Sequence, residues 1–386
     1  MRILCIDCGS SSLKFAAYDF AEGERRLARG AAEGLGQSEG RFWVDDAADV
    51  RVEDSKTGAP WDLDAALPRM ESTLKRIGAG SPDAVGHRLV FGGPNRFEPM
   101  RIAPGLLGDL EEFAPLFPIH LPAQLEALRA TASRYPGVPQ VACFDTAFFR
   151  GMPPVARHYA LPRETWRVLQ RYGYHGLSYE YVLSALGDLA DGRLLVAHLG
   201  SGASMAAILD GVPLDTTMGF SPLGGLMMGT RPGDLDPGAL AYFASAGKYA
   251  RNELLEALYE RCGLLAVSQR SASMQALLEV ADSDAAARQA IDLFIYQAVK
   301  HAAAMAAVLG GLDAFAFTGG IGERSPFIRA RICEGLTHLG IRLDSAANAI
   351  GADVLSSADS RVRVHLVHTD ENLMVARHTN VLLKKQ

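Results

Sequence analysis

The sequence has little excess charge of either sign and no long apolar run. Its 386 residues carry a formal net charge of −6, and no block of lysines or arginines indicates a surface for nucleic acid or membrane. No apolar segment approaches the length that spans a bilayer, and Met1 leads directly into a predicted strand rather than into an export signal. We therefore expect a cytoplasmic protein with a small-molecule ligand and no nucleic-acid or membrane partner.

Cysteine is also scarce. The five cysteines are scattered and odd in number, which argues against a disulfide framework. Cys5 and Cys8 form a C-x-x-C, as a redox pair or half a zinc site would require. However, no second pair exists, and the spacing along a strand sends the two thiols to opposite faces. We expect reduced structural thiols.

The arrangement of apolar segments is typical of an α/β protein. The chain is longer than one hydrophobic core usually supports, so we expect two domains. Strand-like segments end in glycine-rich turns, and longer helical patterns lie between them. The predicted strands are residues 3–6, 84–90, 141–144, 194–199, 314–317 and 362–367, and the predicted helices are 121–135, 252–261, 284–309 and 327–339.

Three of these strands end in turns of small residues, at 9–12, 200–204 and 319–322. Bare backbone lets consecutive N–H groups converge on an anion, and serine hydroxyls or a nearby lysine such as Lys14 strengthen the site. The third turn is bare enough to lie against a nucleobase or ribose. None has the spacing of a Walker loop or a dinucleotide site. The recurrence of one turn in both halves suggests a duplication, with two unrelated hairpins as an equal alternative.

Two arginines lie in otherwise apolar surroundings. Arg88 ends a predicted strand, and Arg231 follows a glycine-threonine turn. A buried arginine needs an anionic partner, and two of them could hold a carboxylate and a transferring phosphoryl group. The alternative is a structural salt bridge to Asp234 or Asp236.

Acids and histidines complete the candidate site. Asp145 and Glu371 each follow a predicted strand, where carboxylates commonly hold Mg²⁺, although either could instead cap a helix. His120 and His175 lie in loops punctuated by proline or glycine, from which an imidazole can donate a hydrogen bond to a phosphoryl oxygen.

The motifs CGSSSLKF, VGHR, FDTAF, RYGYHG, HLGSGAS, MGFSPLGGLMMGTRPGDLDP, FTGGIGER and TDENLMVAR occur in this order. Together they closely resemble the acetate kinase family, over essentially the whole chain. The resemblance implies reversible phosphoryl transfer from ATP to acetate. It also implies two duplicated actin-like (ribonuclease H-like) α/β domains around an interdomain nucleotide cleft, and a homodimer. The expected domains are residues 1–147, with 374–386 returning to them, and the nucleotide-binding, dimerising residues 148–373.

The resemblance also assigns roles to individual residues. Arg88 and Arg231 would hold the acetate carboxylate and the phosphoryl group, and His175, supported by His120, would donate to that group. Asp145 and Glu371 would place Mg²⁺, or Mn²⁺ instead. The acetate methyl group would contact Val90, Ile119, Tyr174 and Pro222, and the nucleotide and its phosphates would contact Ser10, Ser12, Lys14, His198, Gly200, Ser201, Gly202, Ser273, Met274, Gln275, Gly319, Gly320, Ile321, Gly322 and Arg324.

The chain departs from the family pattern at several positions. Asp7 replaces an asparagine, and we predict that it helps to hold Mg²⁺ through water. The adenosine-contacting segment SSDMR reads SASMQ at residues 271–275, and Arg324 replaces an asparagine. Propionate or another short-chain acid therefore stays open as the acceptor, and pyrophosphate or another compound as the donor. A nucleotide-binding scaffold or an inactive sensor is the competing class of function, and the retained arginines, histidine and acids argue against it.

Overall fold

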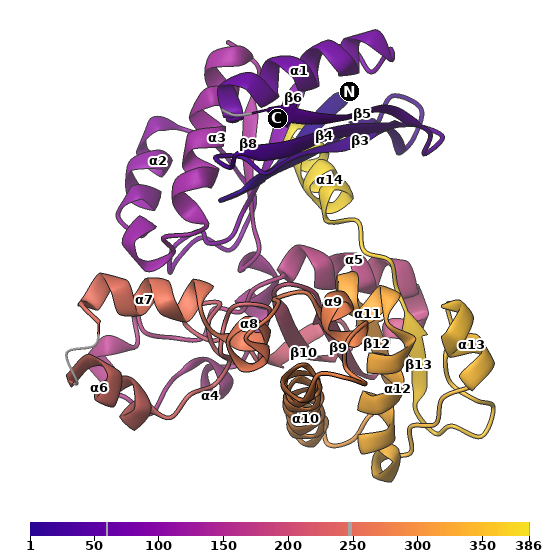
Figure 1. Cartoon of the computed structure of the whole chain (residues 1–386). Coiled ribbons are helices and arrows are strands. Elements are labelled where there is room, and N and C mark those ends of the chain that lie inside the picture. Colours follow the sequence, from indigo (N-terminus) through magenta and orange to yellow (C-terminus); the bar gives the residue numbers. More distant parts are fainter. Residues whose placement is uncertain (59–60, 246–248, 386) are drawn as a thin grey trace. The chain divides into compact units, whose positions relative to one another are not determined.

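The computed structural model describes residues 1–58, 61–245 and 249–385, which form two compact units (Figure 1). The first unit comprises Met1–Ala147 with Asp370–Gln386, and the second comprises Phe148–Thr369. The chain thus returns to the first unit at Asp370 rather than at the expected residue 374. Among the described residues, no helix combines the length and apolar character needed to cross a membrane.

The first unit is built on an eight-stranded sheet with the order β5-β4-β3-β2-β1-β6-β8-β7. Strands β1, β2 and β3 are antiparallel neighbours, whereas β1, β6 and β8 run parallel. The strands are β1 (Arg2–Gly9), β2 (Ser12–Asp19), β3 (Arg25–Glu33), β4 (Glu39–Asp46), β5 (Arg51–Gly58), β6 (Ala84–Leu89), β7 (Met100–Arg101) and β8 (Gln140–Phe144).

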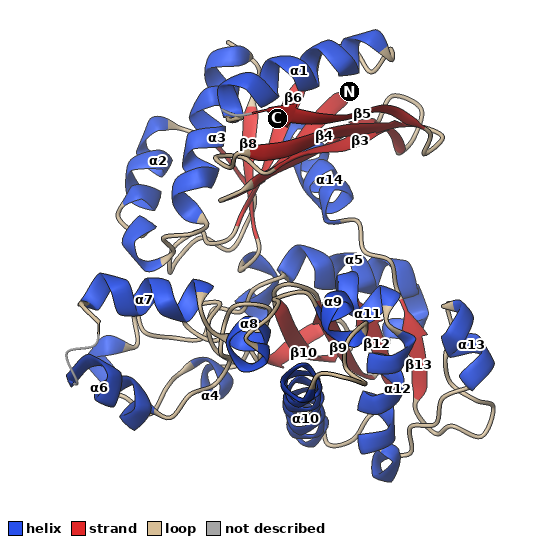
Figure 2. Cartoon of the chain, in the orientation of Figure 1, coloured by secondary structure: helices blue, strands red, loops and turns tan. Residues whose placement is uncertain are grey.

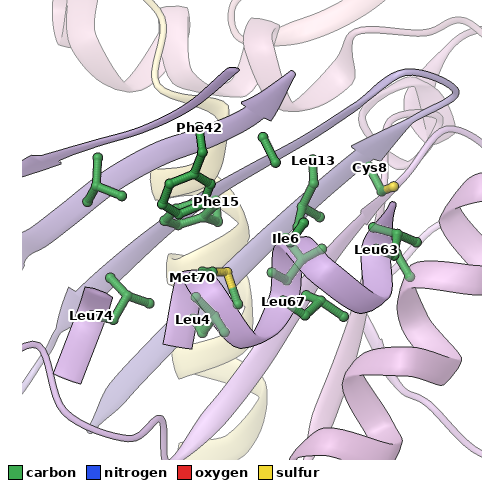
Figure 3. Close-up of a cluster of buried hydrophobic side chains, with 14 of the residues drawn as sticks. Leu4, Ile6, Cys8, Leu13, Phe15, Phe42, Leu63, Leu67, Met70 and Leu74 are labelled. Atoms are coloured by element: carbon green, nitrogen blue, oxygen red, sulfur yellow. The ribbon is translucent and has the colours of Figure 1, made fainter. Parts of the chain in front are cut away.

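Apolar helix faces cover both sides of this sheet. On one side, α1 (Leu63–Arg76) begins at Asp62, whose carboxylate accepts the N–H of Ala65, and buries its leucines against β1 and β2 (Figure 3). On the other side, α14 (Glu371–Lys384) packs on β1 and β6. A Cβ at Gly86 would come within 2.6 Å of Val375, so the close approach of α14 to β6 requires glycine there.

The second unit repeats the same topology. Its five strands have the order β11-β10-β9-β12-β13, with β9, β10 and β11 antiparallel and β9, β12 and β13 parallel. This matches β3-β2-β1-β6-β8 in both order and direction, which confirms the predicted duplicated α/β fold. The strands are β9 (Arg193–Leu199), β10 (Ala203–Leu209), β11 (Val212–Thr216), β12 (Ala314–Thr318) and β13 (Arg363–Leu366).

Helices surround the sheets in each unit (Figure 2). Those of the first unit, besides α1 and α14, are α2 (Pro104–Glu111) and α3 (Leu121–Arg134). Those of the second unit are α4 (Pro154–Arg157), α5 (Gly176–Leu186), α6 (Pro237–Ser245), α7 (Arg251–Glu260), α8 (Gly263–Ser268), α9 (Met274–Leu278), α10 (Ala285–Val308), α11 (Gly319–Arg324), α12 (Pro326–Gly335) and α13 (Ser345–Ile350).

The predicted elements are present, with two differences. The helix expected at 327–339 ends at Gly335, and a short 3₁₀ turn follows at Thr337–Leu339. The prediction of a third glycine turn was wrong, because Gly319–Arg324 forms helix α11. The Glu323 carboxylate accepts the N–H of Gly319 and so stabilises the start of this helix.

The cysteine prediction holds. None of the five cysteines forms a disulfide with another described residue. Cys8 belongs to the core beneath α1, and burial raises its pKa to about 12. It is therefore an inert structural thiol rather than a nucleophile.

Candidate active site

Three strand ends and the start of one helix bring four predicted residues of the first unit together. Asp7 lies near the end of β1, Arg88 near the end of β6, and Asp145 directly after β8. These strands are parallel neighbours, so their carboxyl ends share one edge of the sheet. The fourth residue, Glu371, opens α14, which Asp370 caps by accepting the N–H of Leu373.

Arg88 is the centre of this cluster. Its Nε and Nη2 donate to the Asp145 carboxylate at 3.2 and 2.9 Å, and its Nη1 donates to Asp7 at 3.2 Å and also to Glu371. No side chain of the four is more than 20% exposed. One guanidinium therefore faces three carboxylates, which leaves two negative charges uncompensated when all the acids are ionised.

Burial and the surplus negative charge change the pKa values of these acids. Burial raises the pKa of Asp145 to about 6, with the charges of Glu371 and Asp7 adding to the effect of burial and Arg88 opposing it. Burial likewise raises the pKa of Glu371, whose Oε1 is buried and accepts no hydrogen bond from the described residues. In the described part of the chain, no three His, Cys, Asp or Glu side chains are grouped so that they could hold a metal by themselves. The three carboxylates surround Arg88 instead.

The hairpin between β1 and β2 lies beside this cluster. Ser10 is in the two-residue turn, which is closed by the pairing of Gly9 with Ser12. Lys14 is opposite Asp7 across the hairpin and exposed, and its charge opposes the rise in the pKa of Glu371. The turn thus presents hydroxyls and a cation next to the acids.

The remaining predicted residues of the first unit lie near the ends of β6 and α3. Val90 follows β6, is buried, and donates its N–H to Gln124 of α3 at 3.0 Å. Ile119 and His120 immediately precede α3 and are half-buried.

In the second unit, His175 is held in an unusual conformation. It lies just before α5 with φ 61° and ψ 25°, the left-handed region that few residues other than glycine adopt. Its Nδ1 is 2.9 Å from Ser204 Oγ, and its ring stacks on that of His198 with the centroids 4.2 Å apart. Local strain of this kind persists where the surrounding structure enforces it, often at functional sites.

The turn after β9 contacts both histidine rings. A Cβ at Gly200 would be 3.6 Å from His198 Nε2, and a Cβ at Gly202 would be 3.2 Å from His175 Nε2 and 2.6 Å from Arg231 Nη2. A side chain at position 202 would displace the Arg231 guanidinium, so Arg231 and His175 lie directly against the bare backbone there.

Arg231 is a buried cation without an acidic partner. It is 9% exposed, its Nη1 donates to the Pro222 carbonyl at 2.7 Å, and it forms no ion pair with any described residue. Asp234, the alternative partner, instead accepts the N–H of Gly225 and lies 3.6 Å from His301. Burial lowers the pKa of Arg231 to about 10. A bound anion would compensate this charge.

Tyr174 and Pro222 lie in the same part of the second unit. The Tyr174 hydroxyl donates to the Phe220 carbonyl at 2.7 Å, and the side chain is 1% exposed. Its polar atom is therefore already bonded, which leaves an apolar ring for contact with a methyl group.

A pocket of about 950 Å³ lies between the second glycine turn, α9 and α11. This volume is within the range of small-molecule sites. Gly319 and Gly322 do not line it, because both are buried in α11 and lie next to β9. Eight predicted residues do line it, namely Gly200, Ser201, Ser273, Met274, Gln275, Gly320, Ile321 and Arg324. Ala272, which also lines it, belongs to the predicted adenosine-contacting segment 271–275, and the sequence reasoning missed Leu278, Glu279, Ser325, Pro326 and Phe327.

The sequence reasoning also missed the hydroxyl groups around the two histidines. Ser178 bonds His198 Nδ1 at 2.8 Å, and Tyr179 bonds Ser204. The strand pairing carried a signal, because a hairpin closed at Leu199 and Ala203 places Ser204 opposite His198.

The chain is similar to known proteins over nearly its whole length. Residues 2–377 match the model of the Acetokinase family. An acetate kinase of Nitrobacter hamburgensis is 43% identical over 99% of this chain and 96% of its own. Among solved structures, an acetate kinase of Porphyromonas gingivalis is 35% identical, with a TM-score of 0.85 and 99% of each chain covered. A propionate kinase of Francisella tularensis is 31% identical, with a TM-score of 0.90, and the match covers 98% of this chain and 99% of that one.

Proposed function

Because the chain belongs to the acetokinase family, we propose that it transfers the terminal phosphoryl group of ATP reversibly to acetate, giving acetyl phosphate and ADP. The observation that carries this proposal is Arg231, a buried guanidinium beside His175 and the bare backbone of Gly202, with no acidic partner among the described residues. A transferring phosphoryl group is the anion that such an arrangement fits.

The reaction demands little covalent chemistry of the protein. The acetate carboxylate is already a nucleophile, so no general base is needed. Catalysis then consists of holding two anions in line and neutralising their repulsion. Arg231 and His175 donate to the oxygens of the phosphoryl group, with His120 in support, and Arg88, oriented by its acidic partners, binds the acetate carboxylate.

We propose that two of the acids around Arg88 hold a divalent cation together with water and phosphate oxygens. Asp145 and Glu371 offer buried carboxylate oxygens, one of them without a hydrogen bond, and Asp7 adds a further acid for contact through water. Oxygen ligands of this kind suit Mg²⁺, and Mn²⁺ could replace it. Bound there, Mg²⁺ would neutralise phosphate oxygens of the nucleotide.

The pocket beside the second glycine turn supports a nucleotide as the donor. It has room for the adenosine part, while the turns at 9–12 and 200–202, Lys14 and His198 would contact the phosphates. Pyrophosphate would leave this pocket without a ligand, which favours ATP.

A propionate kinase is the second candidate function, and the similar structure of the Francisella tularensis propionate kinase supports it. We propose that Val90, Ile119, Tyr174 and Pro222 contact the alkyl group of the acid. One methylene changes binding in such a pocket by only about 1–3 kcal/mol, so the preference is a matter of degree.

The remaining expectations follow the family resemblance. We propose that the two units are the catalytic domains, that the second mediates a homodimer, and that the protein acts in the cytoplasm. Light scattering after size-exclusion chromatography tests the dimer.

An acyl-hydroxamate assay tests the function. The protein is mixed with acetate, Mg²⁺ and hydroxylamine, and ATP or pyrophosphate is added in turn. We expect hydroxamate with ATP, a lower rate with propionate, and no product without Mg²⁺. No product with any donor would contradict a kinase and favour a scaffold or sensor.

A further inference from the structure

A chain of hydroxyl groups leads to His175. Ser204 Oγ is 2.9 Å from His175 Nδ1 and also hydrogen-bonds the hydroxyl of Tyr179. Both Ser204 and Tyr179 are fully buried. Tyr179 lies on α5, one turn beyond His175, whereas Ser204 lies on β10. Two different elements therefore meet at the histidine.

The direction of the chain follows from acidity. A phenol is more acidic than an aliphatic alcohol, so it is the better donor and the poorer acceptor. Tyr179 is therefore the donor to Ser204, which leaves the Ser204 proton available for His175 Nδ1. A neutral imidazole whose Nδ1 accepts a hydrogen bond carries its proton on Nε2.

Nε2 is the atom that faces the candidate phosphoryl site. It lies 3.2 Å from a Cβ built at Gly202, and Arg231 Nη2 lies 2.6 Å from the same point. We propose that Tyr179 and Ser204 are positioning residues that fix the tautomer of His175, so that its Nε2–H donates to the transferring phosphoryl group. The identity of that acceptor rests on the proposed function.

The neighbouring histidine limits any rearrangement. His198 stacks on His175 at an interplanar angle of 21°, and its Nδ1 is bonded to Ser178 of α5. His175 Nδ1 is thus bonded to Ser204 of β10, and His198 Nδ1 is bonded to Ser178 of α5. Flipping the His175 ring would break its bond to Ser204 and turn Nε2 away from Gly202, so the donor is oriented before substrate binds.

Steady-state kinetics distinguish a positioning role of Tyr179 and Ser204 from a role in substrate binding. We expect Tyr179→Phe and Ser204→Ala each to lower kcat for acyl-hydroxamate formation about tenfold or more, while KM for acetate and for ATP changes less than about threefold. Tyr172→Phe is the matched control, because Tyr172 is equally buried and donates to the carbonyl of Val168 at 2.7 Å. Values of kcat for both variants equal to the control would overturn the proposal.

Nitrogen-15 NMR of labelled histidines reads the tautomer directly at about pH 8, where an unperturbed imidazole is neutral. The His175 signals are assigned with His175→Gln. We expect a protonated Nε2 and an accepting Nδ1, with Ser204→Ala shifting the signals of His175 and Ser178→Ala those of His198. A proton on Nδ1 of His175 would overturn the proposal. The spectrum needs no turnover, so an inactive protein with the expected tautomer would contradict only the proposed function.

Discussion

Arg231→Met replaces a buried charge with an apolar side chain of similar length. Arg231 is 9% exposed, forms no ion pair with a described residue, and donates to the Pro222 carbonyl. Burying a charge without an opposite partner destabilises a fold, and replacing buried charged groups by apolar ones is often stabilising. The substitution should therefore stabilise the protein and abolish its activity.

The expected change in the free energy of unfolding follows from the pKa of Arg231. Its fall from 12.5 to about 10 corresponds to about 3 kcal/mol against the charged form. For a base with a lowered pKa, this penalty is fully present at every pH below about 10, hence at pH 7. Losing the hydrogen bond to Pro222 costs about 1–2 kcal/mol. We therefore expect Arg231→Met to raise the free energy of unfolding at pH 7 by about 1–2 kcal/mol.

Denaturant unfolding and the hydroxamate assay measure the two effects. We expect higher stability with activity reduced about a thousandfold or more, as for loss of a transition-state donor. Arg342→Met is the control, because Arg342 is exposed and pairs only loosely with Asp359, at 3.6 Å, so both quantities should stay near wild type. A variant that is destabilised by more than about 2 kcal/mol, or that keeps a tenth of the activity, would refute the reasoning.

Three further predictions concern the acids and the nucleotide pocket. Asp7→Asn should raise the Mg²⁺ concentration needed for half-maximal rate about tenfold, because one acid is lost, and unchanged Mg²⁺ dependence would refute its role. Because the pKa of Asp145 is raised to about 6, protons compete with Mg²⁺; the rise in Tm caused by Mg²⁺ should shrink as pH falls from 7 to 5, and Asp145→Asn should weaken that dependence and leave only the contribution of Glu371. Arg324→Ala should raise KM for ATP several-fold and leave KM for acetate near wild type, because Arg324 lines the pocket; equal changes in both would contradict this.

Sequence reasoning predicted the parts of the site that depend on strand ends. Arg88 and Asp145 each end an apolar segment, and the carboxyl ends of neighbouring parallel strands share one edge. The two glycine turns were predicted for the same reason, because bare backbone at a strand end has few roles other than a tight turn or an anion site. The repeat of that turn also indicated the duplicated topology.

The side-chain pairings could not be predicted from the residues alone. Glu371 reaches Arg88 from 283 positions away in the sequence, and only the packing of α14 on β1 and β6 brings it there. Helix α11 was missed because glycine disfavours helices, whereas the contact of Glu323 with the N–H of Gly319 overrides that preference. Tyr179 meets Ser204 because α5 packs on β9, the neighbour of β10, and no local pattern encodes that packing.

We propose that Arg231 and His175 act on the transferring phosphoryl group and that Arg88 holds the acetate that attacks it. A crystal structure with ADP, Mg²⁺, acetate and aluminium fluoride, which mimics the phosphoryl group in transfer, tests it most directly. We expect the planar fluoride to lie between ADP and the acetate held by Arg88, with Arg231 and His175 donating hydrogen bonds to its fluorine atoms. Fluoride bound without Arg231 and His175, or acetate bound away from Arg88, would contradict the account.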